Sequence, residues 1–345
     1  MAQVYHNGNA LEQVEVIKAA PKFPRETGSL FRLPLRKNGG RQPRRVALVQ
    51  NVWQAVAVPN QHRHRARIIT SLNLKGGVGK THACWLIAGV CQERGHRCLV
   101  LDLDKQGNIS TSLQVDGATA VGTDQFFNPG IDPEISALIQ QTSLSHVDVI
   151  PGSFALERYN VTDPIEWEPT GLHRSLIDPL REVAPFYDYI LLDCPADISL
   201  ITFAALCASN FLMVPLEAAQ WGALGTQHVQ KTLQHVQKCH NADLQLLGFV
   251  VSRFKKVRKY QSTYLAQIQD HFADDAFGTV IPDLAPFEQS VNDRIPVVLH
   301  SPTSHAACIA RQFFDELETR TERLSRSREP VCSGRVRQPV KPVAG

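Results

Sequence analysis

Residues 75–81 read Lys-Gly-Gly-Val-Gly-Lys-Thr, and this stretch decides the fold of the chain. An apolar, β-branched run at 68–72 precedes it, which is typical of a buried strand. Apolar residues with helical spacing follow it, at Ala83, Leu86, Ile87 and Val90. A strand, a glycine-rich loop and a helix in this order direct backbone N–H groups and the positive end of the helix toward an anion. The glycines allow close approach to a phosphate, so we predict a phosphate-binding loop.

Two side chains of this loop carry its chemistry. Lys80 is placed to reach the β- and γ-phosphates of a nucleotide, and the Thr81 hydroxyl is placed to bind Mg²⁺. The usual P-loop pattern asks for glycine where this chain has Leu74, and a second lysine, Lys75, opens the loop instead. The alternative is a glycine-rich turn without a ligand. The joint occurrence of glycines, lysine and threonine between a strand and a helix favours the nucleotide site.

Four stretches of the chain resemble the ParA/MinD family of ATPases. Residues 75–81, with the leading lysine, resemble its deviant P-loop, also called the deviant Walker A motif. Residues 99–108 (LVLDLDKQGN) resemble its strand and switch segment, and residues 187–195 (YDYILLDCP) resemble its second acidic strand. Val280-Ile281-Pro282, followed by 295–297 (Ile-Pro-Val), is similar to the closing pattern of ParA-type proteins. The resemblance covers about residues 67–319.

The resemblance implies an ATPase that uses ATP and Mg²⁺ and releases ADP and phosphate slowly, with stimulation by a partner. It implies ATP contacts from Lys75, Gly76, Gly77, Val78, Gly79, Lys80, Thr81, His82 and Pro282. It implies catalytic roles for Lys80, for Asp104, which orients the attacking water, and for Lys75, which crosses a dimer interface to the partner's nucleotide. It implies a Mg²⁺ site at Thr81, Asp102 and Asp193, reached partly through water. Asp102 and Asp104 alternate at one strand end, so we expect them to share a face.

Three positions depart from the family pattern. Lys105 replaces the proline of the switch segment, and His82 replaces a second threonine after the loop. Neither change removes a ligand, although both bear on turnover. We expect His82 to have a capping or packing role and not to bind a metal, because no second metal ligand lies at a suitable spacing. Asp283 follows the closing Ile-Pro, where the family often carries a basic residue.

The rest of the body alternates strands with helices, which predicts an α/β fold with a mostly parallel, twisted sheet and helices on both faces. The expected strands span 67–73, 98–103, 147–150, 187–193, 211–215, 244–251 and 277–281. The expected helices follow the loop as far as Gly95 and then occupy 133–141, 172–183, 198–207, 223–238, the region of 264–272 and that of 309–317. The candidate motifs then fall at the carboxyl ends of strands, where such sheets bind ligands.

Charge is distributed unevenly along the chain. The whole sequence has a formal net charge of +3. Residues 1–67 hold twelve Lys/Arg against three Glu, and residues 321–345 hold six against two, which leaves −10 for the middle. We therefore predict three parts: a basic, largely disordered N-terminal arm (1–64), a P-loop ATPase domain (65–320) and a basic, flexible C-terminal tail (321–345). The N-terminal arm shows no helix-turn-helix pattern, and contact with phosphate backbones and simple solvation both stay open for it.

A basic segment interrupts the acidic body at residues 253–260 (RFKKVRKY), between a predicted strand and helix. In ParA-type proteins, basic residues in this part of the chain bind non-specific DNA after ATP has formed the dimer. We favour DNA over a merely solvated loop. The predicted DNA-binding residues are Arg253, Lys255, Lys256, Arg258 and Lys259.

The composition also bounds the location. No apolar run approaches the roughly 20 residues of a transmembrane helix, and the N-terminus lacks the apolar core of a signal peptide. The eight cysteines lack paired short spacings, so we expect free thiols. These features predict a cytoplasmic protein without a membrane partner, and the resemblance to the ParA/MinD family implies that it is nucleoid-associated.

The leading hypothesis is a ParA-type partition ATPase that segregates plasmid or other replicon DNA. It forms a homodimer with ATP, binds non-specific DNA and is released when a centromere-binding, ParB-type adaptor stimulates hydrolysis. One alternative is a MinD-like ATPase on a membrane surface, which needs an amphipathic C-terminal helix. The sequence after Leu324 instead contains prolines and glycines and has no apolar face. The other alternative is a nucleotide-dependent regulatory or cargo-positioning adaptor with little turnover.

Overall fold

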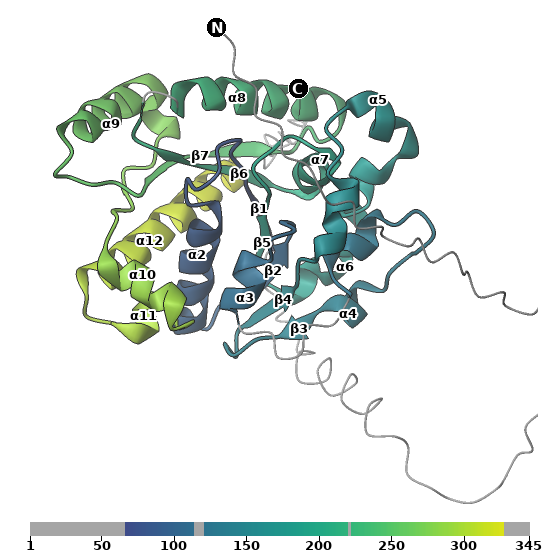
Figure 1. Ribbon diagram of the computed structural model, residues 1–345, viewed down its shortest axis with the longest axis horizontal. Helices are drawn as coiled ribbons and strands as arrows, with labels where there is room; N and C mark the ends of the chain where they lie inside the picture. Colours follow the sequence, from purple (N-terminus) through teal and green to yellow (C-terminus); the bar gives the residue numbers. More distant parts are fainter. Residues whose placement is uncertain (1–65, 114–120, 220–221, 328–345) are drawn as a thin grey trace, which may run out of the picture. The chain divides into compact units, whose positions relative to one another are not determined.

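The computed structural model describes residues 66–113, 121–219 and 222–327 (Figure 1). The predicted N-terminal arm and all but the first seven residues of the predicted tail lie outside the described residues.

Seven strands form one sheet in the order β3-β4-β2-β5-β1-β6-β7. Their bounds are Arg67–Ser71 (β1), Cys98–Asp102 (β2), Gln140–Gln141 (β3), Val147–Ile150 (β4), Tyr189–Asp193 (β5), Phe211–Glu217 (β6) and Gln245–Ser252 (β7). All neighbours are parallel except β3 and β4, which pair antiparallel. The α/β prediction with a mostly parallel sheet is therefore confirmed.

The register of the central strands positions the site. Asp193 at the end of β5 lies opposite Ser71 at the end of β1 and opposite Asp102 at the end of β2. The glycine-rich loop leaves β1 at this same edge. Parallel pairing thus brings together the three segments that the sequence marked separately.

Helices cover both faces of the sheet. The described helices are α2 (Lys80–Arg94), α3 (Asn108–Ser112), α4 (Ile135–Leu138), α5 (Pro164–Trp167), α6 (Ile177–Val183), α7 (Leu200–Ala208), α8 (Gly222–Cys239), α9 (Lys259–Phe272), α10 (Ala285–Asn292), α11 (Val297–His300) and α12 (His305–Arg326). Figure 1 shows α2 and α12 on one side of the central strands and α6 and α7 on the other. Every residue of β2 and of β5 is buried, as strands covered on both faces require.

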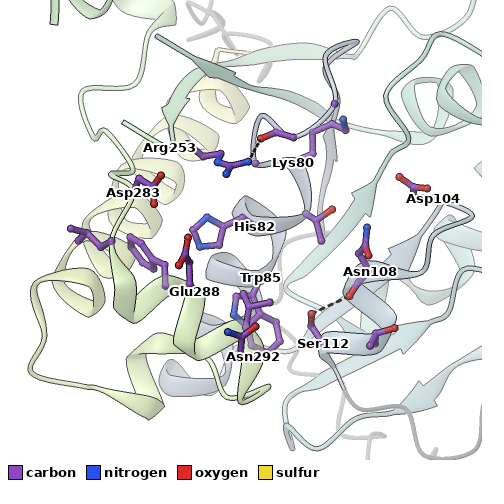
Figure 2. A pocket seen from close by; sticks show the side chains of 18 of the residues that line it. Lys80, His82, Trp85, Asp104, Asn108, Ser112, Arg253, Asp283, Glu288 and Asn292 are labelled. Carbon is purple, nitrogen blue, oxygen red and sulfur yellow. Dashed lines mark hydrogen bonds between the residues drawn. The ribbon is translucent and has the colours of Figure 1, made fainter. Parts of the chain in front are cut away.

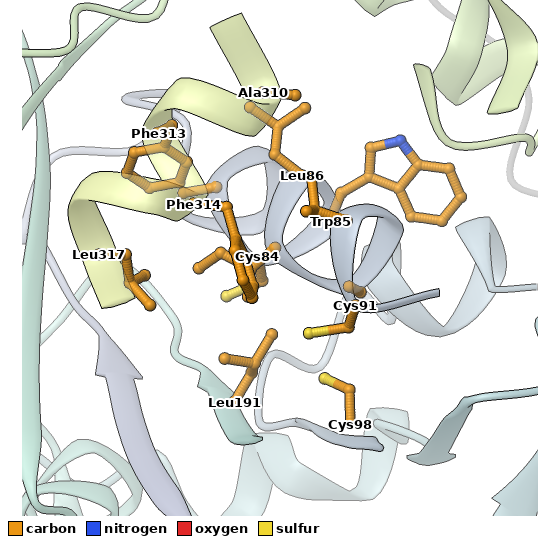
Figure 3. Close-up of a cluster of buried hydrophobic side chains, with 14 of the residues drawn as sticks. Cys84, Trp85, Leu86, Cys91, Cys98, Leu191, Ala310, Phe313, Phe314 and Leu317 are labelled. Carbon is orange, nitrogen blue, oxygen red and sulfur yellow. The ribbon is translucent and has the colours of Figure 1, made fainter. Parts of the chain in front are cut away.

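The largest part of the core lies between α2, α12 and the sheet. Leu86 of α2, Phe313, Phe314 and Leu317 of α12 and Leu191 of β5 belong to one buried cluster (Figure 3). This packing fixes α2, and with it the loop that α2 begins from. The cysteines in the described ranges are free thiols, as expected.

Helix α2 ends as the sequence predicts. Gly95 adopts the left-handed conformation with φ of 74°, and its N–H donates to the Cys91 carbonyl. This is the glycine C-cap that terminates many helices.

Three predicted elements differ from the structure. The predicted strand 277–281 is not a strand, and isolated bridges flank it at Ala276 and Pro282. The N–H groups of Phe277 and Ile281 still donate to carbonyls of β7, but those of Gly278 and Thr279 donate to the Glu316 carboxylate, each at 2.8 Å. The predicted helix 133–141 shortens to α4, followed by the unpredicted strand β3. The predicted helix 172–183 begins only at 177 as α6, since Pro179 lacks an N–H group and suits only a first turn.

The last helix is longer than predicted. It continues to Arg326, six residues beyond the predicted domain boundary at 320. Thr321 is fully buried and Leu324 packs against the core, so the buried stripe of α12 extends into this segment. No helix in the described ranges has the length and hydropathy needed to cross a bilayer.

Candidate nucleotide-binding site

The glycine-rich loop connects β1 to α2 and has the backbone that its glycines permit. Gly77 and Gly79 adopt φ values of 74° and 92°. A Cβ atom at Gly79 would lie 2.7 Å from the Ser252 Oγ. That hydroxyl donates a hydrogen bond to the Val78 carbonyl, so the end of β7 braces the loop. Glycine at 79 is therefore required by both conformation and space.

Lys80 is the first residue of α2, and its side chain is buried in the loop. The ammonium donates to the carbonyl oxygens of Asn73 and Lys75, at 3.2 and 3.4 Å. Burial lowers the pKa of Lys80, and the nearby Asp193 carboxylate opposes that shift. The positive charge is thus held in the curve of the loop, where the sequence predicts phosphate.

Asp193 is a buried carboxylate without a partner. It ends β5 with 1% of its surface exposed, and neither carboxylate oxygen accepts a hydrogen bond from the described residues. Burial raises the pKa of Asp193 well above its usual range, Asp102 raises it further, and the neighbouring Thr81 hydroxyl and Lys80 ammonium lower it. Because an unpaired buried carboxylate is costly, this position fits a bound cation or its water.

Asp102 lies beside Asp193, but its oxygens are occupied. One accepts from the Asp104 N–H at 3.2 Å, and the other accepts from the Ser110 N–H and hydroxyl at 3.1 and 2.6 Å. Burial raises the pKa of Asp102 to about 6, although the bonds from Ser110 lower it. Asp102 therefore holds the segment that starts α3, and its contribution to a Mg²⁺ site stays a prediction.

Asp104 lies beyond the end of β2, in the turn before α3. Its carboxylate accepts the Gln106 N–H at 3.0 Å and lines the cavity described below. Asp102 is fully buried behind it and is not among the lining residues. Strand alternation does not extend to Asp104, because β2 ends at Asp102, so the shared face of the two carboxylates stays a prediction.

A cavity of about 920 Å³ opens beside the loop. Figure 2 shows its side chains converging from the loop and α2, from the switch turn and α3, and from α10. It collects most of the predicted ATP-binding residues and the predicted catalytic aspartate, namely Gly76, Gly77, Gly79, Lys80, Thr81, His82, Pro282 and Asp104. Asn108, Asp283 and Phe287 also line it, although the sequence motifs predict no ligand contact for any of them.

Lys75 and Val78 are not among the lining residues. Val78 is buried, and the Lys75 ammonium pairs with the Glu217 carboxylate at the end of β6. The structure thus brings Lys80, Thr81 and Asp104 together around one cavity and keeps Lys75 outside it.

His82 forms part of the cavity wall. Its ring meets Phe287 edge to face, with 5.0 Å between the ring centroids. Burial lowers the pKa of His82 to about 4, and the Arg253 guanidinium lowers it further while Asp283 opposes. The ring is neutral at pH 7, and its contact with Phe287 agrees with the expected packing role.

The predicted DNA-binding residues divide into two groups. Arg253 lines the cavity, and its guanidinium donates to the Gly77 carbonyl at 3.0 Å. Lys256, Arg258 and Lys259 are exposed on the segment beyond it, and Lys255 pairs with Asp283 at 3.0 Å. Arg253 directly follows β7, so its place at the carboxyl edge of the sheet was available from the sequence.

Comparison with known proteins places these features in a family. The model of the AAA domain family (AAA_31) matches residues 66–246, more than half of the chain. The sporulation initiation inhibitor protein Soj of Bacillus subtilis is 29% identical over 244 residues, which cover 70% of this chain and 94% of Soj. The chromosome partitioning protein ParA of Myxococcus xanthus is 28% identical over 236 residues, which cover 68% of this chain and 81% of that protein.

Solved structures share the same fold. The cobyrinic acid a,c-diamide synthase of Mycobacterium smegmatis, with bound ADP and magnesium, superposes with a TM-score of 0.62 at 24% identity, covering 74% of this chain and 96% of the synthase. At this identity the likeness shows the architecture alone. The matched family model, the relatives and the P-loop geometry agree. The chain therefore belongs to the AAA domain family and is an ATPase of the ParA/MinD superfamily.

Proposed function

We propose that the protein is a ParA-type partition ATPase that dimerises with ATP, binds non-specific DNA and segregates a replicon together with a centromere-binding adaptor. One observation carries this proposal. A buried Lys80 inside a deviant P-loop lies at the same sheet edge as the unpaired carboxylate of Asp193. That combination suits a nucleotide polyphosphate accompanied by a divalent cation.

The residues of the site fit Mg²⁺ bound together with ATP. Thr81 supplies a hydroxyl and Asp193 supplies two free carboxylate oxygens, which are the hard donors that Mg²⁺ prefers. No group of three His, Cys, Asp or Glu side chains within the described ranges is arranged to hold a metal. Such a sparse set agrees with a cation that takes its other ligands from phosphates and water. When bound, Mg²⁺ neutralises charge that develops on the transferred phosphoryl group.

The remaining chemistry belongs to side chains of the chain itself. Lys80 holds the β- and γ-phosphates and compensates their charge. Asp104 faces the cavity and accepts a single backbone hydrogen bond, so its free oxygen is available to orient a water molecule for attack. Phosphoryl transfer requires mainly this positioning and charge compensation.

The partition cycle requires a second subunit and DNA. Lys75 is exposed and outside its own cavity, which suits a role at the phosphates of a partner subunit. Lys255, Lys256, Arg258 and Lys259 form a basic loop, and the last three are exposed to an approaching duplex. The basic loop is defined here as residues 255–259. Relatives that act in chromosome partitioning make segregation the preferred cellular role.

One experiment tests the proposal directly. Binding of a 60-base-pair duplex of arbitrary sequence is measured with ATP, with ADP and without nucleotide. The proposal predicts tight binding with ATP alone and none by the Lys80→Ala variant, which loses the main phosphate cation. Equal binding in all three states would exclude the nucleotide-controlled DNA step, and an adaptor with little turnover would then replace the partition ATPase.

A further inference from the structure

Arg253 has an unusual backbone conformation and lies in the wall of the nucleotide cavity. It is one of three non-glycine residues with positive φ in the described ranges, and its φ is 53°. Its guanidinium lines the nucleotide cavity and donates to the Gly77 carbonyl at 3.0 Å (Figure 2). Backbone strain of this kind persists only where the surroundings enforce it, and it gathers at ligand sites.

The surroundings of Arg253 do enforce this conformation. The next residue, Phe254, donates to the Ile281 carbonyl at 3.2 Å and accepts the Asp283 N–H at 2.9 Å. On the preceding side, Ser252 is fully buried and bonds to the Val78 carbonyl. Arg253 is therefore clamped between the P-loop and the segment that ends at Asp283.

The basic loop begins at this clamp. The Lys255 ammonium pairs with the Asp283 carboxylate at 3.0 Å, and Asp283 itself lines the cavity. The Lys255 N–H donates to the Gln261 side chain at 2.6 Å, and the Lys255 carbonyl accepts from Arg258 at 2.9 Å. Lys255, the first residue of the basic loop, is thus held by two residues of the cavity wall. Arg253 lies two positions before it in the chain, and Asp283 forms an ion pair with it.

We propose that Arg253 is a ligand of the nucleotide phosphates, not of DNA, and that Arg253 and Asp283 couple nucleotide binding to the position of the basic loop. A guanidinium presents five N–H donors, and its hydrogen bonds to a phosphate are about twice as strong as those to a neutral carbonyl. A polyphosphate in the cavity therefore draws Arg253 away from Gly77. Phe254 and Lys255 follow Arg253 directly in the chain. A movement of Arg253 therefore changes how Lys255 is held against Asp283. The coupling rests on the proposed contact of the basic loop with DNA.

The nucleotide arm of the test uses no DNA. Affinity for ATP is measured by calorimetry for Arg253→Asn, Arg253→Lys and the wild type. Asparagine tolerates the left-handed backbone, and lysine keeps the charge but not the fork of donors. We expect about tenfold weaker ATP binding for Arg253→Asn, the size of one charge-assisted hydrogen bond, with partial recovery for Arg253→Lys.

The matched control is Arg181→Asn, which removes an exposed arginine of α6 whose one ion pair with the described residues is to Asp178. It is expected to bind ATP like the wild type. Thermal unfolding without nucleotide checks that each variant is folded. Wild-type ATP affinity in folded Arg253→Asn would remove Arg253 from the nucleotide site.

The coupling arm measures DNA binding with and without ATP for Asp283→Asn. This change frees Lys255 and is expected to raise binding without nucleotide several-fold, so that the ratio between the two states falls. Asp270→Asn removes the same charge from an exposed site on α9 and is expected to leave the ratio unchanged. An unchanged ratio in Asp283→Asn would overturn the coupling. Absence of wild-type DNA binding with ATP would overturn both the coupling and the proposed function, while the calorimetry would still decide the place of Arg253.

Discussion

The ammonium of Lys75 is paired with the carboxylate of Glu217, the last residue of β6. The backbone of Lys75 is also fixed to this strand, because its N–H donates to the Asn73 side chain at 3.0 Å and the Asn73 amide donates to the Pro215 carbonyl at 2.6 Å. The side chains of Lys75 and Glu217 are 43% and 26% exposed. Such a pair contributes about 0–1 kcal/mol, so another anion readily replaces it.

This pair predicts opposite effects for its two members. Lys75→Ala is expected to bind ATP normally but to lose ATP-dependent dimerisation or hydrolysis. Glu217→Gln frees Lys75 and is expected to strengthen the ATP dimer by up to about fivefold, the equivalent of 1 kcal/mol. Light scattering at several protein concentrations, together with phosphate release, measures both. If Lys75→Ala dimerises and hydrolyses like the wild type, the deviant-loop interpretation fails.

Asp193 and Asp102 lie side by side, yet their substitution is expected to act in opposite directions on stability. Asp193→Asn removes a buried carboxylate whose oxygens accept no hydrogen bond from the described residues, and should stabilise the nucleotide-free protein by about 1 kcal/mol or more. Asp102→Asn places an amide where three donors now bond and should destabilise it by about 1–3 kcal/mol.

Thermal unfolding with and without Mg²⁺ and ATP distinguishes the roles of these two residues. The stabilisation that the wild type gains from the two ligands together should be lost in Asp193→Asn. If Asp193→Asn keeps this gain in full, Asp193 has no part in binding the cation.

Asp104→Ala is expected to prevent hydrolysis and leave a long-lived ATP dimer. The structural reason is that the Asp104 carboxylate faces the cavity and, among the described residues, accepts one hydrogen bond, from the Gln106 N–H. Its loss therefore removes a water-orienting oxygen without disturbing the buried network of Asp102. Phosphate release and gel filtration with ATP provide the measurement. A variant that turns over at the wild-type rate would exclude Asp104 from the mechanism.

Acid is expected to remove the contribution of three wholly or partly buried histidines to stability, whereas Asp102 and Asp193 act in the opposite direction because burial raises the pKa of both carboxyl groups. Burial lowers the pKa of His82 from 6.5 to about 4, and burial also lowers the pKa of His173 and His240. Because the histidines bind protons more readily in the unfolded than in the folded chain, their contribution to stability is complete above pH 6.5 and falls as the pH drops toward 4. The share of His82 is at most about 3.5 kcal/mol, at about 1.4 kcal/mol per pKa unit.

Urea unfolding at pH 7 and pH 5 measures this loss. His82→Gln should lose less stability than the wild type over the same interval, because glutamine does not titrate. An equal loss in both proteins would mean that the pKa of His82 is the same in the folded and in the unfolded chain.

The sequence predicts the central strands and the P-loop well because local pattern and tertiary role coincide there. The run 68–72 and the glycines of 75–81 meet the demands of a buried strand and of left-handed turns, and Gly95 ends α2 where a C-cap is expected. The residues at 277–281 have the pattern of a strand, but Glu316, distant in sequence, accepts the N–H groups of Gly278 and Thr279. Only the packing of α12 decides that outcome.

In the site, too, local sequence pattern predicts some residues and fails to predict others. The motifs identify Lys80, Thr81, Asp104 and Asp193 because their spacing is local. Arg253 belongs to a basic run by sequence, yet its positive φ turns it toward Gly77 and away from the residues that follow it. That direction depends on the bridge between Phe254 and Pro282, which no spacing along the chain reveals.

The last prediction concerns DNA. Replacing Lys255, Lys256, Arg258 and Lys259 with alanine should weaken ATP-dependent binding for every DNA sequence alike, because phosphate contacts carry no sequence information. Each lost contact should lower the slope of log affinity against log salt by about 0.9, so four contacts lower it by at most about 3.6. The ATP dimer should still form, since Lys256, Arg258 and Lys259 are exposed and line no part of the cavity. Titrations between low and physiological salt measure the slope.

Deletion of residues 1–60 is the parallel experiment, and the two effects should add if the contacts are independent. If the deletion abolishes binding while the alanine variant keeps the wild-type slope, the DNA contacts lie in the N-terminal arm and the assignment of the basic loop is wrong.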